Sequence, residues 1–570
     1  MERSDHATEG DPLKRGEDGT ETVTGAASAS GPKKRSCKGL GFSRLTHWRT
    51  AVFFLSLFLC LIIVFAFSFI MPCPVRAQYL VTWKKTFSES GLFFLFFFLF
   101  ILHLRNILNR GLTVTLTFSH TVTYEFLAFE HSNDDKVKDV LFIIKNTNGT
   151  LNQTCTEAGL PSPCVFVVAV DGTDGDTLWE RPLHPEFQWA HCDQGKKTSR
   201  TWHCLMSHSG NLTAINKNTG HVIWQQPQPT VLVGSLPVLS VPDLDQDQVD
   251  DVVLVASNST LTQLILLSGK TGAQMGSTVV LDSVQTANHL IHVTVKGFYY
   301  ILLQNDTDVY GLELLGIAAK AGLKTDKVME AKANSAVTLL PIYQSNAVSL
   351  VRTKEADDSS DLLVVSGNEV ALINGKTLRL KWKFSCSSVI GKPSLGHFNK
   401  DGVLDVVVED DVGNQTKRII ILDGKSGGVL WEVRLLAIAN SPGPASIYTT
   451  KSISVFIVWG LMPSESNSTK PLSISQRSYL LHPHHSEVLL EITNVTDHIL
   501  SFKATLMEHG RHAAYLLLTG PESEDTNGTV VLTKQKLKQN ISKDDVRHLG
   551  TSTETNEEIV EAFQRLRFSD

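Results

Sequence analysis

Residues 422–431 read LDGKSGGVLW: an apolar strand end, a turn rich in glycine and a second apolar stretch that closes on tryptophan. Glycine and asparagine tolerate a positive φ, so this order of residue types predicts a tight hairpin between two strands. The tryptophan is expected to pack the second strand onto a neighbouring sheet. Similar stretches lie at residues 170–179, 215–224 and 373–382, and a variant at 268–275 ends on methionine.

The spacing of these hairpins predicts a propeller. Their closing residues, 179, 224, 275, 382 and 431, are separated by 45, 51, 107 and 49 positions. The gap of 107 amounts to two units, which predicts a degenerate copy near residue 330, and a further copy is expected from Tyr479 to Leu490. A period of about 45–50 residues with four strands is typical of a propeller blade. We therefore predict an all-β fold, a β-propeller of about seven blades, with eight as the alternative count.

A loop at residues 243–251 carries four aspartates in front of an apolar strand. Asp243, Asp245, Asp247 and Asp251 occupy relative positions 1, 3, 5 and 9. Alternate residues of a tight loop project their carboxylates to one side, which suits the oxygen ligands that Ca²⁺ requires. A polar turn closed by hydrogen bonds from side chain to backbone is the alternative. We predict calcium as the one candidate cofactor, bound by this loop and stabilising the fold.

Other clusters have simpler explanations. Loops that begin at His131 and His397 share the spacing, but histidine is a poor ligand for a hard cation, so we interpret them as structural turns. Residues 482–485 (HPHH) are expected to form a solvated turn between strands rather than a metal site. Three Gly-Lys-Thr/Ser tripeptides lack the glycine that a phosphate-binding loop carries five positions earlier, so we interpret them as blade turns. These tripeptides stand at residues 269–271, 375–377 and 424–426.

The N-terminal part contains a predicted membrane anchor. Residues 31–50 carry six basic side chains and no acidic one, and residues 51–70 carry no charge. Twenty residues of helix at ~1.5 Å per residue cross the hydrocarbon layer. The basic side stays in the cytoplasm by the positive-inside rule, so we predict a single-pass type II membrane protein. Most of the chain then lies in the secretory pathway or at the cell surface.

Glycosylation and cysteine patterns agree with that compartment. Cys155 with Cys164, and Cys192 with Cys204, are locally spaced pairs suited to disulfides in an oxidising environment. Zinc binding by the second pair with His203 and His208 is the weaker alternative. Ten Asn-x-Ser/Thr acceptor sites follow the apolar segment and none precedes it. The acceptor residues are Asn148, Asn152, Asn211, Asn258, Asn305, Asn414, Asn467, Asn494, Asn527 and Asn540.

A second apolar stretch conflicts with this topology. Residues 91–104 read GLFFLFFFLFILHL, fourteen residues before a charged one. A crossing here would return the remainder to the cytosol, against the acceptor sites and the cysteine pairs. We interpret the stretch as non-spanning, either membrane-associated or a foreign insertion, with a crossing as the alternative.

The repeated units resemble a known blade type. An acidic loop, a strand and an Asp-Gly-x-Thr-Gly-x-x-x-Trp hairpin are similar to the FG-GAP blades of integrin alpha chains and to pyrroloquinoline-quinone-type blades. Residues 480–496 (LLHPHHSEVLLEITNVT) and 511–521 (RHAAYLLLTGP) further resemble the family with sequence similarity 234. The resemblance covers about residues 47–74 and 122–570. It implies a membrane-anchored propeller with no established catalytic activity.

We divide the chain into five predicted parts. The pattern of residues 556–566 predicts a helix outside the ring, within the last of them. The parts are a disordered cytosolic tail (1–48), a transmembrane signal-anchor helix (49–71), a linker with the atypical apolar insertion (72–121), the propeller ectodomain (122–545) and a C-terminal tail (546–570).

Charge and motifs narrow the function. A net charge of −6 gives no support to a nucleic-acid partner, which would call for a clustered basic face. No nucleophile elbow, zinc-protease motif or nucleotide-binding fingerprint is present, so we predict no enzymatic activity. We expect a binding module for a protein or glycan partner. The alternatives are an assembly or trafficking factor of the endoplasmic reticulum and, from the blade type alone, a quinone-dependent dehydrogenase.

Overall fold

The chain forms two compact units, Met1–Ala77 and Gln78–Asp570. The computed structural model describes residues 48, 51–62, 86–87, 115–133, 135–146, 151–192, 203–228, 238–257, 261–282, 288–304, 308–323, 340–344, 347–354, 359–463, 475–508, 512–521, 528–538, 541–551 and 553–569. The predicted tail (1–48) except residue 48, and the apolar stretch 91–104, lie outside this part of the chain.

The predicted transmembrane helix was wrong. The charge-free stretch is helical over its described residues, 51–62. Among the described residues, no helix has both the length and the apolar character that a membrane crossing requires. The rest of the predicted anchor, residues 63–71, lies outside the described residues.

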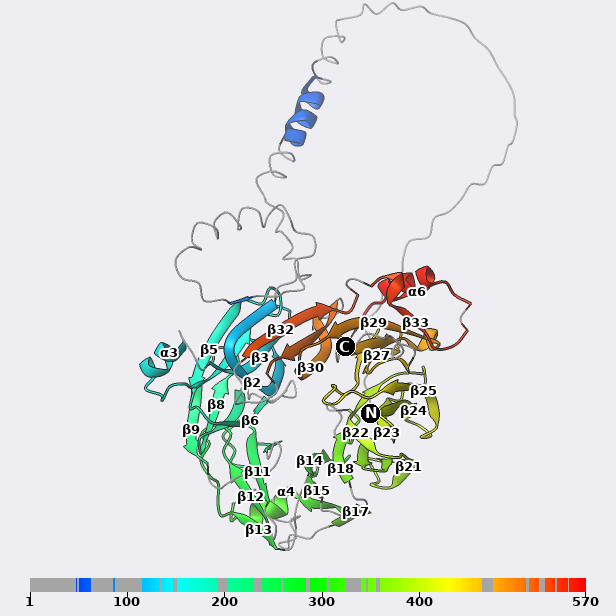
Figure 1. The fold of residues 1–570 in the computed structure, drawn as a ribbon. Helices are drawn as coiled ribbons and strands as arrows, with labels where there is room; N and C mark the ends of the chain where they lie inside the picture. The colour runs from blue at the N-terminus through cyan, green and yellow to red at the C-terminus, as the bar shows by residue number, and fades with distance from the viewer. Residues whose placement is uncertain are drawn as a thin grey trace, which may run out of the picture. The chain divides into compact units, whose positions relative to one another are not determined.

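The described strands of the second unit form a β-propeller of eight blades, which follow one another around a ring (Figure 1). Consecutive strands of a blade pair antiparallel, from the first strand at the inside of the ring to the fourth at the outside. The first four blades are β2 (Thr115–Glu130), β3 (Asp139–Asn146), β4 (Val165–Val170) and β5 (Thr177–Leu183); β6 (Phe187–Cys192), β7 (His203–His208), β8 (Asn211–Asn216) and β9 (Val222–Pro227); β10 (Val238–Val241), β11 (Asp251–Ser257), β12 (Leu261–Leu267) and β13 (Val279–Asp282); β14 (Asn288–Val293), β15 (Tyr299–Gln304), β16 (Asp308–Glu313) and β17 (Leu340–Gln344).

The second half of the ring repeats this order, with two differences. Blade 7 gains a fifth strand at its outer edge, and blade 8 has three strands of its own. The strands are β18 (Ala347–Arg352), β19 (Leu362–Ser366), β20 (Glu369–Ile373) and β21 (Leu380–Ser385); β22 (Val389–Gly396), β23 (Asp405–Gly413), β24 (Thr416–Leu422) and β25 (Val429–Leu436); β26 (Ala445–Tyr448), β27 (Ser454–Trp459), β28 (Gln476–Leu481) and β29 (Val488–Val495), extended by β33 (Val546–His548); and β30 (Ile499–Glu508), β31 (His512–Thr519) and β32 (Gly528–Lys536).

The first strand of the propeller closes the ring. β2 pairs with β32 through residues 115–121 and with β3 through residues 121–130, and its register shifts twice along the way. Its first half is therefore the outermost strand of blade 8, and its second half is the innermost strand of blade 1. β1 (Thr86–Phe87) adds to β2 in parallel. Because the first and last blades share one strand, the ring opens only if that pairing breaks.

The blade count is eight, the alternative to the predicted seven, because blade 8 lacks the hairpin on which the counting depends. Blade 8 borrows its outer strand from β2, so no hairpin ending on tryptophan is needed there. In blade 4, helix α4 (Leu314–Lys320) follows the third strand. The degenerate copy expected near residue 330 lies outside the described residues. The copy expected from Tyr479 to Leu490 is confirmed as β28 and β29.

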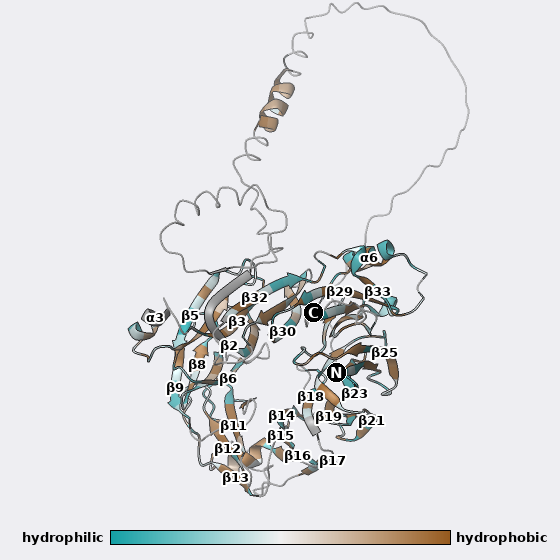
Figure 2. Ribbon diagram, viewed as in Figure 1, coloured by the Kyte–Doolittle hydropathy of each residue, from teal (hydrophilic) through white to brown (hydrophobic). Residues whose placement is uncertain are grey.

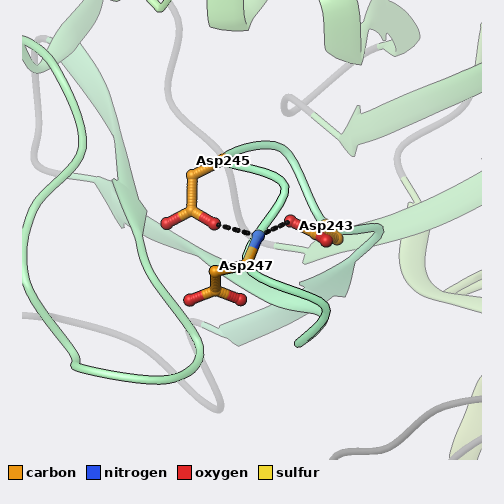
Figure 3. A group of neighbouring side chains, drawn as sticks. All are labelled: Asp243, Asp245 and Asp247. Carbon is orange, nitrogen blue, oxygen red and sulfur yellow. Dashed lines mark hydrogen bonds between the residues drawn. The ribbon is translucent and has the colours of Figure 1, made fainter.

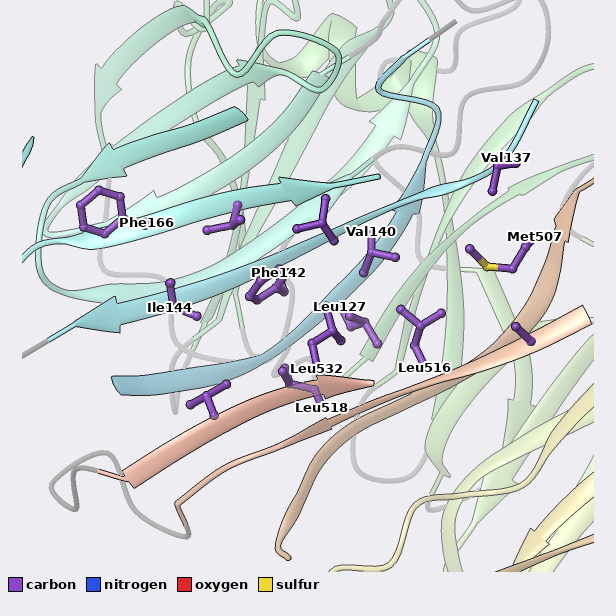
Figure 4. Close-up of a cluster of buried hydrophobic side chains, with 14 of the residues drawn as sticks. Leu127, Val137, Val140, Phe142, Ile144, Phe166, Met507, Leu516, Leu518 and Leu532 are labelled. Atoms are coloured by element: carbon purple, nitrogen blue, oxygen red, sulfur yellow. The ribbon is translucent and has the colours of Figure 1, made fainter. Parts of the chain in front are cut away.

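The hydrophobic core lies between neighbouring blades. Each sheet is covered on both faces, so strands in the middle of a blade can be apolar throughout, as in β4, where all six residues of VFVVAV are buried. Figure 2 shows these strands in brown, as hydrophobic segments. Between blades 8 and 1, Phe142 and Leu127 belong to the same buried cluster as Leu516 and Leu532 (Figure 4). Side chains from both ends of the chain thus share one core.

Two helices fill spaces between blades. Leu314 and Ile317 of α4 lie in the cluster that joins blades 3 and 4. Helix α6 (Asn556–Gln564) begins with a capping box at Thr555 and buries Ile559 and Phe563 in the cluster shared by blades 7 and 8. The predicted C-terminal helix is confirmed, and the residues before it supply β33 to blade 7.

Both predicted disulfides are present. Cys155 in α3 (Leu151–Glu157) is bonded to Cys164, with their Cα atoms 5.9 Å apart. Cys192 and Cys204 join β6 to β7, with Cα atoms 4.1 Å apart. Because Cys192 and Cys204 bond to each other, the zinc alternative is removed. The first disulfide lies in the connection between β3 and β4, and the second links two neighbouring strands of blade 2.

Candidate functional site

The loop between β10 and β11 gathers three of its four aspartates. Oxygens of Asp243, Asp245 and Asp247 all lie within 4.8 Å of one another. The Asp247 N–H donates to both Asp243 Oδ1 and Asp245 Oδ1, each at 3.1 Å (Figure 3). Gln246 and Gln248 adopt φ values of 65° and 71°, so the chain turns left-handed twice within the loop. This winding points alternate carboxylates toward one place.

The three carboxylates suit a hard cation. A calcium ion takes oxygen ligands at ~2.3–2.6 Å, so two of its ligand atoms lie up to about 5 Å apart, in line with the observed limit of 4.8 Å. In the part of the chain that the structure describes, no Lys, Arg or His forms an ion pair with Asp243, Asp245 or Asp247. The group therefore has donors for Ca²⁺ and no protein cation that neutralises it.

The structure places Asp251 apart from this group. It is fully buried at the start of β11, and its two oxygens accept N–H bonds from Leu244 at 2.6 Å and from Gly269 at 3.0 Å. Leu244 belongs to the acidic loop, whereas Gly269 belongs to the hairpin after β12. Asp251 therefore braces the loop against the hairpin.

This brace recurs in four blades. Asp405 accepts N–H bonds from Phe398 at 2.7 Å and from Asn399 at 3.2 Å in its loop, and from Gly424 at 3.0 Å in its hairpin. In each braced blade an aspartate at or just before the second strand accepts the N–H of the hairpin glycine. The pairs are Asp139 with Gly172, Asp251 with Gly269, Asp361 with Gly375 and Asp405 with Gly424, each at 3.0 Å.

The hairpin glycine is required because the backbone passes too close for a side chain. A Cβ at Gly424 would lie 1.9 Å from the carbonyl oxygen of Leu404, the residue before the brace aspartate. Cβ atoms at Gly172, Gly269 and Gly375 would lie 1.9–2.0 Å from the corresponding carbonyl oxygens. Sequence reasoning assigned these glycines only a turn. The joint recurrence of Asp before a strand and Gly in the hairpin is the signal that predicts the brace.

Each hairpin also receives a bond from the preceding blade. The Trp382 indole N–H donates to the Gly424 carbonyl at 2.9 Å, and the ring lies where a Cβ at Gly427 would be. The predicted packing of the aromatic onto a neighbouring sheet is thus confirmed. Equivalent indole bonds run from Trp179 to Lys217 at 3.2 Å, from Trp224 to Gly269 at 2.9 Å and from Trp431 to Ser486 at 2.9 Å.

Two other side chains replace the indole where no tryptophan is available. His292 of β14 lies with Nε2 2.9 Å from the Gly375 carbonyl, which can only accept, so the imidazole N–H donates the bond. Burial lowers the pKa of this imidazole. Lys534 of β32 donates from Nζ to the Gly172 carbonyl and joins blade 8 to blade 1. Burial lowers the pKa of Lys534 to about 8. Nothing in the repeat pattern indicates either residue.

Burial is the main cause of the raised pKa values of the brace aspartates. It raises the pKa of Asp139 to about 7 and that of Asp251 to about 6, while the backbone N–H bonds act in the opposite direction. The pKa of Asp405 is raised by the same cause. These carboxyls are therefore structural groups whose charge is costly, and the N–H donors compensate part of that cost.

The remaining sequence clusters are turns. All three Gly-Lys-Thr/Ser tripeptides lie between the third and fourth strands of their blades, as predicted. His482 precedes a short 3₁₀ turn, Pro483–His485, between β28 and β29. It is buried rather than solvated, because Phe563 of α6 packs with ring centroids 5.8 Å away.

Four of the acceptor asparagines fall within the described residues. Asn414 and Asn494 are exposed, Asn211 is half-buried, and Asn152 lies in α3. The other six acceptor sites lie outside the described residues: Asn148, Asn258, Asn305, Asn467, Asn527 and Asn540.

Comparison with known proteins agrees with the blade architecture. A family described as FAM234A/B beta-propeller matches residues 115–569. The chain is 33% identical over 541 residues to Protein FAM234A of Bos taurus and 32% identical over 540 residues to Protein FAM234A of Homo sapiens, with 92% of each chain covered. Among solved structures, the WD40 domain of SCAP from fission yeast is 10% identical with a TM-score of 0.41, covering 73% of this chain and 94% of that one. This chain belongs to the FAM234A/B beta-propeller family.

Proposed function

We propose that this protein is a non-enzymatic binding module that holds a protein or glycan partner. One observation carries the proposal: the ring is closed by its own first strand and braced at the hairpins of four blades. A scaffold of this kind keeps its loops in fixed relative positions, and binding proteins commonly use loops on rigid scaffolds. The loops then select the partner, while the braces maintain the geometry.

We place this module in the lumen of the secretory pathway or at the cell surface. Disulfides such as Cys155–Cys164 and Cys192–Cys204 persist in oxidising compartments and are rare in the cytosol. Exposed acceptor asparagines, Asn414 and Asn494, are consistent with a glycoprotein.

The second candidate is an assembly or trafficking factor resident in the endoplasmic reticulum, with the same architecture. Glycan processing separates the two. We expect the full-length protein from animal cells to carry complex glycans that resist an endoglycosidase specific for high-mannose chains, because a surface protein passes through the Golgi. Complete sensitivity to that enzyme would instead assign the protein to the endoplasmic reticulum.

We further propose that the Asp243 loop binds Ca²⁺. A ligand that binds only the folded state stabilises it by about 2.7 kcal/mol at a concentration one hundred times its Kd. Millimolar Ca²⁺ should therefore raise the thermal denaturation midpoint of the purified protein relative to a chelator. The double variant Asp243→Asn/Asp245→Asn should lose this shift, since it removes two charges from the group in Figure 3.

The loop before β23 supplies the matched control. Asp401 is an exposed aspartate of a loop with the same spacing, and one of its oxygens accepts the Val403 N–H at 2.8 Å. Asp401→Asn should leave the calcium shift intact. A midpoint that is equal in Ca²⁺ and in chelator for the unmodified protein would contradict calcium binding.

A further inference from the structure

The two ends of the ring can be told apart from the strand directions. Strands of a blade alternate in direction, so the connection from first to second strand and that from third to fourth strand lie at the same end. The bond from Asp405 to Gly424 joins these two connections directly in blade 6. At the same end, the indole bonds join the hairpin of one blade to the tryptophan of the preceding blade. We call this end of the ring the brace face. The other end, which carries the connections from second to third strand, is called the opposite face.

The acceptor asparagines gather at the opposite face. Asn414 lies in the turn between β23 and β24, Asn211 begins β8, and Asn152 lies between β3 and β4. These are all connections from second to third strand. Asn494 stands near the end of β29, a fourth strand, which also ends at the opposite face. All four described acceptor sites are therefore on one side of the ring.

The other six acceptor sites lie outside the described residues. Five of them fall in sequence between the second and third strands of their blades. Asn540 is the exception, because it follows β32, a third strand that ends at the brace face. The five are Asn148, Asn258, Asn305, Asn467 and Asn527.

An N-linked glycan is bulky and hydrated, so it obstructs close protein contact wherever it is attached. All four acceptor sites within the described residues belong to the opposite face. Among the described residues the brace face carries no acceptor site, so it stays accessible to a partner.

The brace face also has a charge pattern. Its acidic part includes the exposed Asp174 and Asp176 of blade 1 and the Asp243 group of blade 3. Blades 4–7 present six exposed basic side chains at this face that form no ion pair within the described residues, whereas Lys381 pairs with Asp361. We call them the basic arc: Lys296, Lys376, Arg379, Lys400, Lys425 and Lys451.

Two acidic neighbours within this arc already serve their own loops. Asp423 accepts the Lys425 N–H at 3.1 Å and the Ser426 hydroxyl, and Asp401 accepts the Val403 N–H at 2.8 Å. They hold the turns in shape, whereas the lysine side chains extend into solvent. Unpaired cations on a surface of fixed geometry attract a complementary acidic surface and raise the rate of association.

We propose that the partner is a protein that docks on the brace face across blades 4–7, with an acidic surface opposite the basic arc. This inference rests on the proposed function, because it names the face and the chemistry that the binding module uses.

The test uses photo-crosslinking in living cells that produce the full-length protein. A photoreactive amino acid is placed at Lys425 on the brace face or, as the matched position of the same blade, at the exposed Val412 on the opposite face. We expect one discrete protein adduct from position 425 and none from position 412. With the crosslinker at 425, Lys400→Glu/Lys451→Glu should reduce the adduct about tenfold, as expected when like charges face each other.

Two controls define the surface. Lys136→Glu reverses an exposed charge in blade 1 and should leave the adduct unchanged. A glycan can also be added to either part of the face: Thr450→Asn creates the acceptor site Asn-Lys-Ser beside Lys451, and Asp174→Asn/Asp176→Thr creates one in blade 1. The glycan at 450 should abolish the adduct, and the glycan at 174 should not.

The outcomes separate this inference from the proposed function. An adduct from position 412 and not from 425 would leave a binding module that uses the opposite face, and the inference would be overturned. Blocking by the glycan at 174 but not at 450 would reject the basic arc. The absence of a protein adduct from both positions would contradict the docking inference. If, in addition, no protein or glycan partner of the full-length protein could be detected, the proposed binding function would be contradicted as well.

Discussion

Asp405→Ala should lower the free energy of unfolding by about 4 kcal/mol, because it leaves three backbone N–H groups without their acceptor. Those groups belong to Phe398, Asn399 and Gly424, and Asp405 itself is fully buried. An unpaired buried donor costs roughly 1–3 kcal/mol, so the sum is far larger than the loss of one exposed bond. Denaturant unfolding of the purified protein measures the change.

The matched variant is Asp401→Ala in the same loop. Asp401 is exposed, and its carboxylate accepts the Val403 N–H, so loss of this side chain should cost no more than about 1 kcal/mol. An effect of Asp405→Ala as small as that of Asp401→Ala would show that the brace does not hold the blade together.

Gly424→Ala should cost about 3 kcal/mol, because the new Cβ would lie 1.9 Å from the Leu404 carbonyl oxygen. The obstacle is backbone rather than a flexible side chain, so the hairpin has to move away from the strand that it closes. That movement also lengthens the bonds from Asp405 and from Trp382 to Gly424. The denaturation midpoint should fall accordingly.

Two other glycines separate this clash from the general effect of adding a methyl group. Gly402 has a φ of +80° with nothing within 4 Å of a Cβ, so Gly402→Ala tests backbone strain alone, at roughly 1 kcal/mol. Gly367 has open space and no positive φ, and Gly367→Ala should stay within about 0.5 kcal/mol of the parent. If Gly424→Ala were no more destabilising than Gly402→Ala, the close approach at the brace would be disproved.

The repeated hairpins made the propeller predictable, because their turn chemistry and their tryptophan are local signals. Closure was not predictable, since β2 pairs with β32 across most of the chain and neither strand carries a motif. Blade 4 was predicted from the gap of 107 positions, but its bond to the next blade was not, because that bond comes from His292 on an inner strand, where a histidine has no characteristic pattern. Long-range pairing of this kind is decided by packing and not by local propensity.

The acidic loop was predicted in position but only partly in role. Spacing alone placed Asp251 with the other three carboxylates, whereas its oxygens bond to Leu244 and to Gly269, eighteen positions further along the chain. The N–H of Gly269 becomes available only once the hairpin has formed, so no local rule assigns it to Asp251. The predicted membrane helix rested on twenty uncharged residues beside a basic cluster, whereas no helix of the described residues has the length and apolar character of a membrane crossing.

Glycopeptide mass spectrometry of the full-length protein from animal cells tests the central claim most directly. We expect N-glycans on the exposed Asn414 and Asn494 and on acceptor sites in the connections from second to third strand. Such a map would place the ring in the secretory pathway and its glycans on the face opposite the braces. Unmodified asparagine at every acceptor site would contradict both the compartment and the one-sided binding surface.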